Sequence, residues 1–339
     1  MGNHIQDILE YWHPQRDACR WVLGTVVQTE GSSYRKVGAM MMFNERGEFF
    51  GLLSGGCLEK ALFNDVKKVI SYNRCLEVEF DSTGDTDVAW QLGLGCGGKV
   101  RILLQPVLAE NQYQQLDTLL AALRARQSVR YRVNLAAHCV NWLEPAPPST
   151  DVPITRVCAD QADAPEGSTE LILSLTARRH LVVFGAGVDA VPLVQMAKTL
   201  GWQLTLIDHR VAYAQPQHFN AADTIIRQPA GHAEVIKHLA AADAAFIMTH
   251  NVQLDAEALT VLLPTRVQYI GLLGPAHRKH RVLIKAGLKH DGRIHGPMGL
   301  DLGGELPESI ALAALAQCHQ VLELAESQRP SLGALEKCR

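Results

Sequence analysis

The chain has 339 residues, of which 47% are hydrophobic and 20% charged, and its formal net charge is −3. This length allows two domains with separate cores, and the composition is that of an ordinary globular protein. The small negative charge, without a basic patch, argues against binding to nucleic acid or to an anionic membrane.

The first residues and the pattern of cysteines both bear on the cellular location of the protein. Residues 1–17 contain neither the basic nor the apolar segment of a signal peptide, and no apolar run is long enough to span a bilayer. The eight cysteines form no C-x-x-C pair and no regular spacing, which argues against a disulfide framework and a four-cysteine zinc site. We therefore expect a cytoplasmic protein.

The N-terminal part of the chain mixes helices and strands. Residues 5–20 have the apolar spacing of a helix, and residues 56–72 predict a second one. Apolar and β-branched segments between glycine turns predict strands at 20–29, 39–53, 75–80 and 99–107. This pattern predicts an α+β domain over residues 1–108.

Cys57 follows Gly55 and Gly56 at the start of the second predicted helix. A large ligand can approach a thiol between residues without side chains, and the helix N-terminus favours the thiolate. The residues alone leave two interpretations open. Cys57 is either a ligand or nucleophile, or a small buried side chain at the end of a turn.

Cys96 lies in a second glycine turn, between Gly95 and Gly97. Two such thiols in one domain suggest a shared purpose, since soft thiolates suit molybdenum, copper(I), zinc or iron–sulfur centres and bare loops suit a pterin or a phosphate. A cysteine hydrolase is an alternative, although no histidine lies near either cysteine in the sequence. A serine hydrolase is not supported, because Leu52 stands two residues before Ser54, where G-x-S-x-G requires glycine.

Residues 109–178 are expected to connect two domains. Residues 111–127 have the pattern of an amphipathic helix, and the proline-rich stretch 141–153 favours a hinge. Residues 152–178 fit one or two further strands of either domain.

From residue 179 the pattern changes to apolar runs that alternate with helical segments. Runs buried on both faces are typical of a parallel sheet covered by helices, with right-handed crossovers. The sequence therefore predicts a doubly wound α/β domain over residues 179–330. Its strands are expected within 180–187, 203–209, 223–228, 244–250 and 267–274.

A glycine-rich turn follows the first of these strands. Gly185, Gly187 and Ala190 form G-x-G-x-x-A between a strand and a helix, where a pyrophosphate binds at the helix N-terminus. Asp208 ends the next strand, where a carboxylate binds ribose hydroxyls. This pattern predicts a site for NAD or another nucleotide, with Arg210 weakening the preference for NAD over NADP.

Other strand ends of the same domain carry polar residues. Thr249 and His250 end the fourth predicted strand, and His250 is either a ligand-binding side chain or a histidine bonded within its loop. Gly274 precedes a basic helix start that is either an anion site or a solvated helix face. The basic residues are Arg278, Lys279 and Arg281.

Together these motifs resemble the XdhC/CoxI family, whose members mature molybdenum hydroxylases such as xanthine dehydrogenase. In the first domain the resemblance lies in TEGSSYRKVGAMM, GLLSGGCLEKAL and LGLGCGGKV. In the second it lies in HLVVFGAGVDAVPL, LIDHR, MTHNVQLD, YIGLLGPAHRKHR and IHGPMGLDLGGELPESIA. The resemblance covers nearly the whole chain except the region around 109–178. It implies an XdhC/CoxI-type domain followed by a Rossmann-like domain.

The resemblance implies a chaperone without turnover of its own. Its cargo is the molybdenum cofactor (molybdopterin). The chaperone protects this cofactor while a cysteine desulfurase partner helps to sulfurate it. The chaperone then inserts the cofactor into an apo molybdenum hydroxylase. A homodimer is also implied. Cys57 and Cys96 become candidate molybdenum contacts, with Arg35 and Glu59 as polar supports. Tyr34 replaces the proline that usually precedes this arginine, and Pro275 replaces a small polar residue.

Two other interpretations of the second domain remain. One is an NAD(P)-dependent oxidoreductase, with His250 and His295 as the only candidate proton carriers. The other is a pocket for the nucleotide or phosphate portion of the pterin cofactor. The expected cofactor-binding residues are Arg35, Ser54, Gly55, Gly56, Cys57, Glu59, Cys96, Gly97, Gly185, Gly187, Asp208, His250 and Gly274.

Overall fold

The computed structural model describes residues 2–53, 58–81, 98–135, 140–145, 155–159 and 169–327. The chain divides into two compact units, and the division falls between Ala177 and Arg178.

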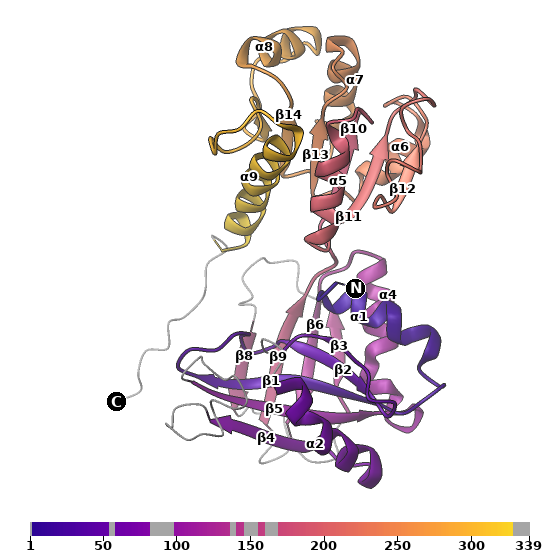
Figure 1. The fold of residues 1–339 in the computed structure, drawn as a ribbon, viewed down its shortest axis with the longest axis vertical. Coiled ribbons are helices and arrows are strands. Elements are labelled where there is room, and N and C mark those ends of the chain that lie inside the picture. Colours follow the sequence, from indigo (N-terminus) through magenta and orange to yellow (C-terminus); the bar gives the residue numbers. More distant parts are fainter. Residues whose placement is uncertain are drawn as a thin grey trace. The chain divides into compact units, whose positions relative to one another are not determined.

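The first unit contains a five-stranded antiparallel sheet in the order β3-β2-β1-β5-β4 (Figure 1). Alternate residues of its central strand face opposite sides, as the two-residue period of a strand requires. Val22 and Val26 pack with α2 (Leu58–Tyr72), while Leu23 and Val27 join the core on the other face. The strands are β1 (Trp21–Glu30), β2 (Met40–Asn44), β3 (Phe49–Gly51), β4 (Leu76–Asp81) and β5 (Lys99–Val107).

The core on that other face includes α1 (Ile5–Trp12), which is followed by η1 (His13–Gln15), and α4 (Leu116–Arg124). It also includes residues of a four-stranded antiparallel sheet in the order β7-β6-β9-β8. The strands are β6 (Val129–Asn134), β7 (Trp142–Pro145), β8 (Thr155–Ala159) and β9 (Thr169–Leu175). The described part of the segment 109–178, expected to connect two domains, therefore folds within the first unit up to Ala177.

The helix predicted over 111–127 begins later than its apolar spacing indicates. Residues 112–115 have positive φ, so η2 (Ala109–Gln115) cannot continue as a regular right-handed helix into α4. Gln114, in this irregular turn, accepts a hydrogen bond through its carbonyl oxygen from the buried Tyr131 hydroxyl at 2.7 Å. The turn is thus fixed by a tertiary contact.

A buried amide pair joins the two sheets of the first unit. The side chains of Gln105 and Asn141 donate to each other at 3.0 and 2.9 Å. Asn141 also donates to the Tyr131 hydroxyl at 2.9 Å and accepts from the backbone of Asn134 at 3.0 Å. Because each of these buried polar groups has partners, their hydrogen bonds offset the cost of desolvation while the network joins the two sheets.

The second unit contains a six-stranded parallel sheet in the order β12-β11-β10-β13-β14-β15, which confirms the doubly wound prediction. Its order reverses at β10, which lies between β11 and β13. Ligands of such sheets bind at the carboxyl edge beside this reversal. The strands are β10 (His180–Phe184), β11 (Gln203–Ile207), β12 (Thr224–Ile226), β13 (Ala244–Ile247), β14 (Tyr269–Leu272) and β15 (Ile294–His295).

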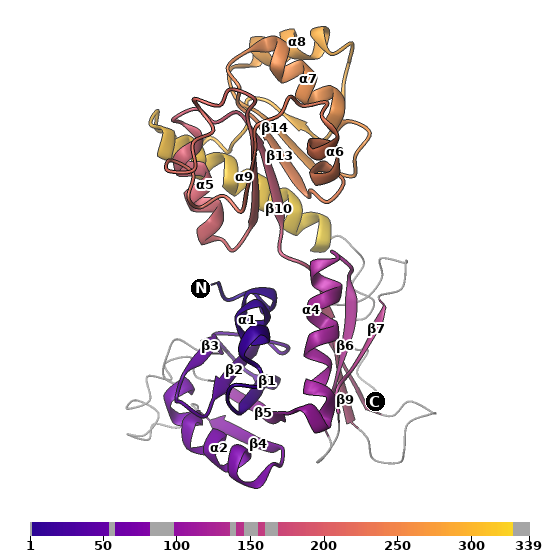
Figure 2. The same cartoon turned by 90° about the vertical axis from the view of Figure 1, so that its right-hand side faces the viewer.

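Helices cover both faces of this sheet, as Figure 2 shows. Leu181 and Val183 of β10 pack with α5 (Ala190–Thr199) and α9 (Pro307–Ser327). Val182 and Phe184 join the core on the opposite face. The helices there are α6 (Ala233–Leu239), α7 (Val252–Leu262) and α8 (Ala276–Lys285). Burial on both faces explains why the strands read as continuous apolar runs.

Candidate functional site

The strand ends next to three connecting segments of the first unit lie at the same end of the five-stranded sheet. The ends of β1 and β4, Glu30 and Asp81, both lie opposite Lys99 at the start of β5. At the same end, Met41 near the start of β2 lies opposite Gly51 at the end of β3. The segments that connect these strand ends onward are 31–39, 52–57 and 82–98. They carry the three motifs on which the family resemblance of the first domain rests.

The glycine and cysteine residues of these motifs lie outside the described residues. They are Ser54, Gly55, Gly56, Cys57, Cys96 and Gly97. Their described neighbour Gly98 packs so tightly that a Cβ on it would lie 2.5 Å from the carbonyl oxygen of Glu30. The residue after Cys96 and Gly97 thus adjoins the start of the segment 31–39.

Glu59 is fully buried in the first turn of α2. Its carboxylate accepts a hydrogen bond from the backbone N–H of Leu53 at 3.1 Å. Leu53 and Leu58 flank the segment that carries Cys57, so Glu59 fixes one side of that segment to the other. This geometry makes Glu59 a support of the loop.

Arg35 lines a groove between the segment 34–39 and the end of β9. Two adjoining cavities of about 340 and 260 Å³ share Arg35, Gly38 and Ser174. Within the described part of the chain, no hydrogen bond or ion pair engages the Arg35 guanidinium. Lys36 adds a second positive charge to the lining. The groove therefore offers cationic donors to an anionic ligand.

The glycine turn of the second unit lies at the carboxyl end of β10. Gly185 has a φ of 107°, and a Cβ on it would lie 2.7 Å from the carbonyl carbon of Met248. Only glycine meets both conditions, which allows β10 to turn sharply beside β13. Ala186 is buried, and its backbone N–H donates to Asp208 Oδ2 at 2.9 Å. The turn is thereby tied to the end of β11.

Both carboxylate oxygens of Asp208 are engaged within the chain. Oδ1 accepts from the backbone N and Nε of Arg210, both at 2.9 Å, and Oδ2 accepts from Arg210 Nη2 at 2.6 Å and from Ala186. Burial opposes ionisation, but the bonds from Arg210 and Ala186 outweigh it, and the pKa of Asp208 is lowered. Ribose hydroxyls would have to displace the Arg210 guanidinium to reach this carboxylate.

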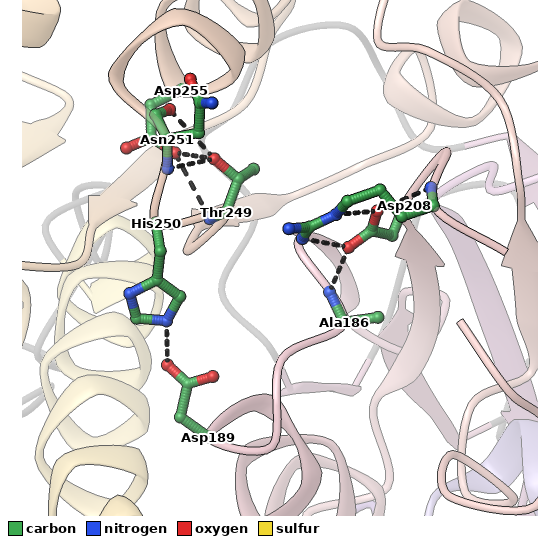
Figure 3. Close-up of polar contacts among 8 residues, drawn as sticks. Ala186, Asp189, Asp208, Thr249, His250, Asn251 and Asp255 are labelled. Atoms are coloured by element: carbon green, nitrogen blue, oxygen red, sulfur yellow. Dashed lines mark hydrogen bonds and ion pairs between the residues drawn. The ribbon is translucent and has the colours of Figure 1, made fainter. Parts of the chain in front are cut away.

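Asp189 and His250 form a pair over the glycine turn (Figure 3). His250 Nε2 lies 2.8 Å from Asp189 Oδ2, and the other carboxylate oxygen fills the space that a Cβ on Gly187 would need. His250 holds a left-handed backbone with a φ of 60°. The carboxylate thus lies where a phosphate would approach Gly187.

The basic residues after Gly274 are largely engaged by the chain. Arg278 packs over Gly274, where a Cβ would lie 2.6 Å from its Cδ, and its Nη2 donates to Asp255 Oδ2 at 2.6 Å. Lys279 donates to the carbonyl oxygen of Ile294 at 2.9 Å. Arg281 is exposed. Arg278 and Lys279, two of the three cations expected for an anion site, therefore bond to neighbouring segments of the chain.

His295 lies in β15, away from the Asp189–His250 pair in the strand order. Its ring stacks on Tyr269 with centroids 4.5 Å apart, and Tyr269 donates to Gln317 at 2.7 Å. Burial, together with the charge of Lys279, lowers the pKa of His295. The ring thus packs against Tyr269, where burial disfavours its charged form.

A cavity of about 170 Å³ opens between the carboxyl ends of β10, β11 and β13. It lies on the side of α7, which contributes Leu254 and Glu257. Apolar side chains make up half of the lining, and polar side chains the rest. The lining residues are Phe184, Ile207, Asp208, His209, Gln228, Pro229, Ala230, Thr249, Leu254 and Glu257.

Sequence reasoning did not single out Asp189 or Asp255. Asp189 occupies a variable position of G-x-G-x-x-A, and an acid there is a readable signal because it opposes a phosphate. Asp255 is fully buried and accepts from the Thr249 hydroxyl at 2.5 Å as well as from Arg278. The position of Asp255 within the sequence of α7 gives no comparable signal of this role.

Neither a metal cluster nor a membrane span is present in the described ranges. There, no group of three or more histidine, cysteine, aspartate or glutamate side chains is arranged to hold a metal ion. In the same ranges, every helix is too short or too polar to cross a bilayer.

The chain belongs to the XdhC and CoxI family. The family model matches residues 15–81, and the model of the XdhC Rossmann domain matches residues 181–318. Both units thus carry the family's features, and the resemblance drawn from the motifs is confirmed.

Alignments with individual relatives cover most or nearly all of the chain. It is 31% identical to a Bacillus subtilis protein named as a probable xanthine dehydrogenase subunit, over 333 residues that make up 94% of this chain and 98% of that protein. It is 21% identical to the molybdenum cofactor insertion chaperone PaoD of Escherichia coli, covering 88% and 83% of the two chains. A crystal structure described as a xanthine dehydrogenase from Bacillus halodurans aligns with a TM-score of 0.78 at 29% identity, covering 98% of each chain.

Proposed function

We propose that the chain is a maturation factor that binds the molybdenum cofactor and delivers it to an apo molybdenum hydroxylase of the xanthine dehydrogenase type. Membership in the XdhC and CoxI family supports the maturation role, and similarity to PaoD supports the cofactor as cargo. The chain acts on its cargo by binding, without turnover of its own.

The observation that carries this proposal is that the described strand ends next to the three motif-bearing segments lie at one end of the five-stranded sheet. Arg35 lies on one of these segments, and its guanidinium, unpaired among the described residues, suits the phosphate of a pterin cofactor. Cys57 and Cys96 belong to the sequences of the other two motif-bearing segments, and thiolates are ligands that soft metal centres accept. Glu59 supports this arrangement by anchoring Leu53.

The finer steps of the role rest on the family resemblance. They are protection of the cofactor during sulfuration by a cysteine desulfurase, insertion into the hydroxylase, action as a homodimer and a cytoplasmic location. We do not propose the NAD(P)-dependent oxidoreductase alternative, because Arg210 engages Asp208 and the Asp189 carboxylate lies over Gly187.

The proposal is tested by the molybdenum and pterin content of protein purified anaerobically from molybdate-fed cells. Wild type should carry both. Cys57→Ala, Cys96→Ala and Arg35→Ala should each lose most of the bound cofactor while remaining folded. Arg74→Ala is the matched control for Arg35, because Arg74 is exposed just before β4, at the opposite end of the sheet. Cys75→Ala is the control for the two cysteines.

Folded wild type without molybdenum or pterin would overturn the proposal. Cofactor retained in every variant would place the binding site elsewhere. Fully active hydroxylase in cells that lack this protein would also exclude the delivery role.

A further inference from the structure

The cavity at the carboxyl edge of the second unit has the size and the walls of a site for a flat ring. Phe184, Ile207 and Leu254 provide apolar surfaces, and Pro229 narrows the space beside them. A volume of about 170 Å³ is below the range of roughly 300 to 1,000 Å³ for pockets that enclose drug-sized ligands. The cavity therefore has room for one ring system, and the remainder of a larger ligand would lie outside it.

Polar groups at the rim of this cavity can read the edge of a heterocycle. The Gln228 amide carries both donors and an acceptor, and within the described residues it makes no side-chain hydrogen bond. Glu257 adds an exposed carboxylate on α7. A nitrogen heterocycle offers matching acceptors and donors, which favours such a ring over a purely apolar one.

The cavity lies beside the point where the strand order reverses, next to Asp208 at the end of β11. In Rossmann-type sheets the nucleoside part of a ligand binds at this edge, and its phosphates continue to the glycine turn. The position of the cavity therefore indicates a nucleoside. The surroundings of the glycine turn determine whether a nucleoside with or without phosphates can bind.

That turn already holds an anion of the chain itself. Asp189 directly precedes α5, so its carboxylate lies in the positive field of the helix N-terminus that a phosphate would use. One oxygen fills the space over Gly187, and His250 holds the other at 2.8 Å. A phosphate at this place would meet a like charge at close range.

We propose that the cavity bounded by Phe184, Leu254 and Gln228 binds a purine nucleoside without phosphates, and that Asp189, held by His250, excludes phosphorylated nucleotides. Asp208 contributes by fixing the turn through Ala186, because its own acceptor sites are occupied by Arg210. The second unit thereby holds a nucleoside site and not a dinucleotide site.

Titration calorimetry of the full chain with adenosine, AMP and NAD tests this inference. Wild type should bind adenosine, and AMP and NAD should bind at least about tenfold more weakly. Asp189→Asn should strengthen AMP binding by about tenfold while leaving adenosine binding unchanged, because only the phosphate meets the lost charge. Glu308→Gln, which removes an acid from the first turn of α9, should change neither affinity.

A second pair of variants tests the cavity itself. Leu254→Trp should abolish adenosine binding by filling the space, and Gln228→Ala, a smaller change at the rim, should weaken it by about tenfold. Absence of adenosine binding to wild type, tighter binding of AMP or NAD than of adenosine, or an Asp189→Asn variant that still rejects AMP would overturn the inference. No molybdenum enters these titrations, so their failure and a failure of the cofactor proposal are separable.

Discussion

The guanidinium of Arg278 donates to the carboxylate of Asp255 at 2.6 Å, and it joins the start of α8 to the start of α7. The Asp255 side chain is 1% exposed and that of Arg278 is 21% exposed. Asp255 also accepts from Thr249, the residue that follows β13 by two positions. One buried ion pair thus fixes two of the loops at the carboxyl edge of the parallel sheet.

Removal of Arg278 should therefore destabilise the second unit. Arg278→Ala leaves the Asp255 carboxylate buried without its cation, and the free energy of unfolding should fall by about 3 kcal/mol. Urea denaturation measures the change. Arg281→Ala, an exposed arginine of the same helix, should change it by less than about 0.5 kcal/mol. Similar values for both variants would show that the ion pair contributes no stability.

The lowered pKa of Asp208 predicts a loss of stability in acid. The ordinary pKa of this carboxyl is 3.8, and in the folded chain it is lower, so the folded state binds the proton less readily than the unfolded state. The contribution is complete above that value and disappears as the pH falls through the folded pKa. Denaturation of wild type and Asp208→Asn between pH 7 and pH 2 should show the difference between them shrinking toward low pH. A constant difference would contradict the Asp208–Arg210 interaction.

Alanine substitutions at Gly185 and Gly287 distinguish the conformational cost of a side chain at positive φ from the cost of a steric collision. Gly287 has a φ of 72° and open space around it, so Gly287→Ala should cost only the conformational penalty of about 1 kcal/mol. Gly185→Ala adds a collision with the backbone of Met248. Its free energy of unfolding should fall by at least about 2 kcal/mol more than that of Gly287→Ala. An equal loss of unfolding free energy in both variants would mean that the backbone after β13 moves away from the new Cβ without cost.

The buried amide network of the first unit should be intolerant of an apolar replacement. Asn141→Leu removes both hydrogen bonds of the buried Gln105 amide and the bond that the Tyr131 hydroxyl accepts, although this hydroxyl still donates to Gln114. Each buried group left unsatisfied costs about 1 to 3 kcal/mol. Guanidinium denaturation should show a loss of about 3 kcal/mol in the transition of this unit. Gln127→Leu, at an exposed position after α4, serves as the matched control and should change stability by less than about 0.5 kcal/mol.

Local patterns were sufficient for most helices and strands. The apolar runs of residues 179–330 predicted the parallel sheet because strands buried on both faces leave a continuous signal. The helix over 111–127 was placed too early, because positive φ at residues 112–115 is fixed by contacts with Tyr131 and not by local spacing. The four-stranded sheet within 129–175 was only partly anticipated, since its strands pair antiparallel across long sequence gaps.

The sequence by itself determined the family, the doubly wound sheet and the glycine turn, because motifs and hydrophobic periods are local properties of the chain. Only the tertiary structure decided what surrounds these residues. It brings His250 to Asp189, which is 61 residues earlier in the chain, and joins Asp208 to the backbone of Ala186, which is 22 residues earlier. Side-chain direction and burial follow from packing between distant segments, which no local pattern encodes.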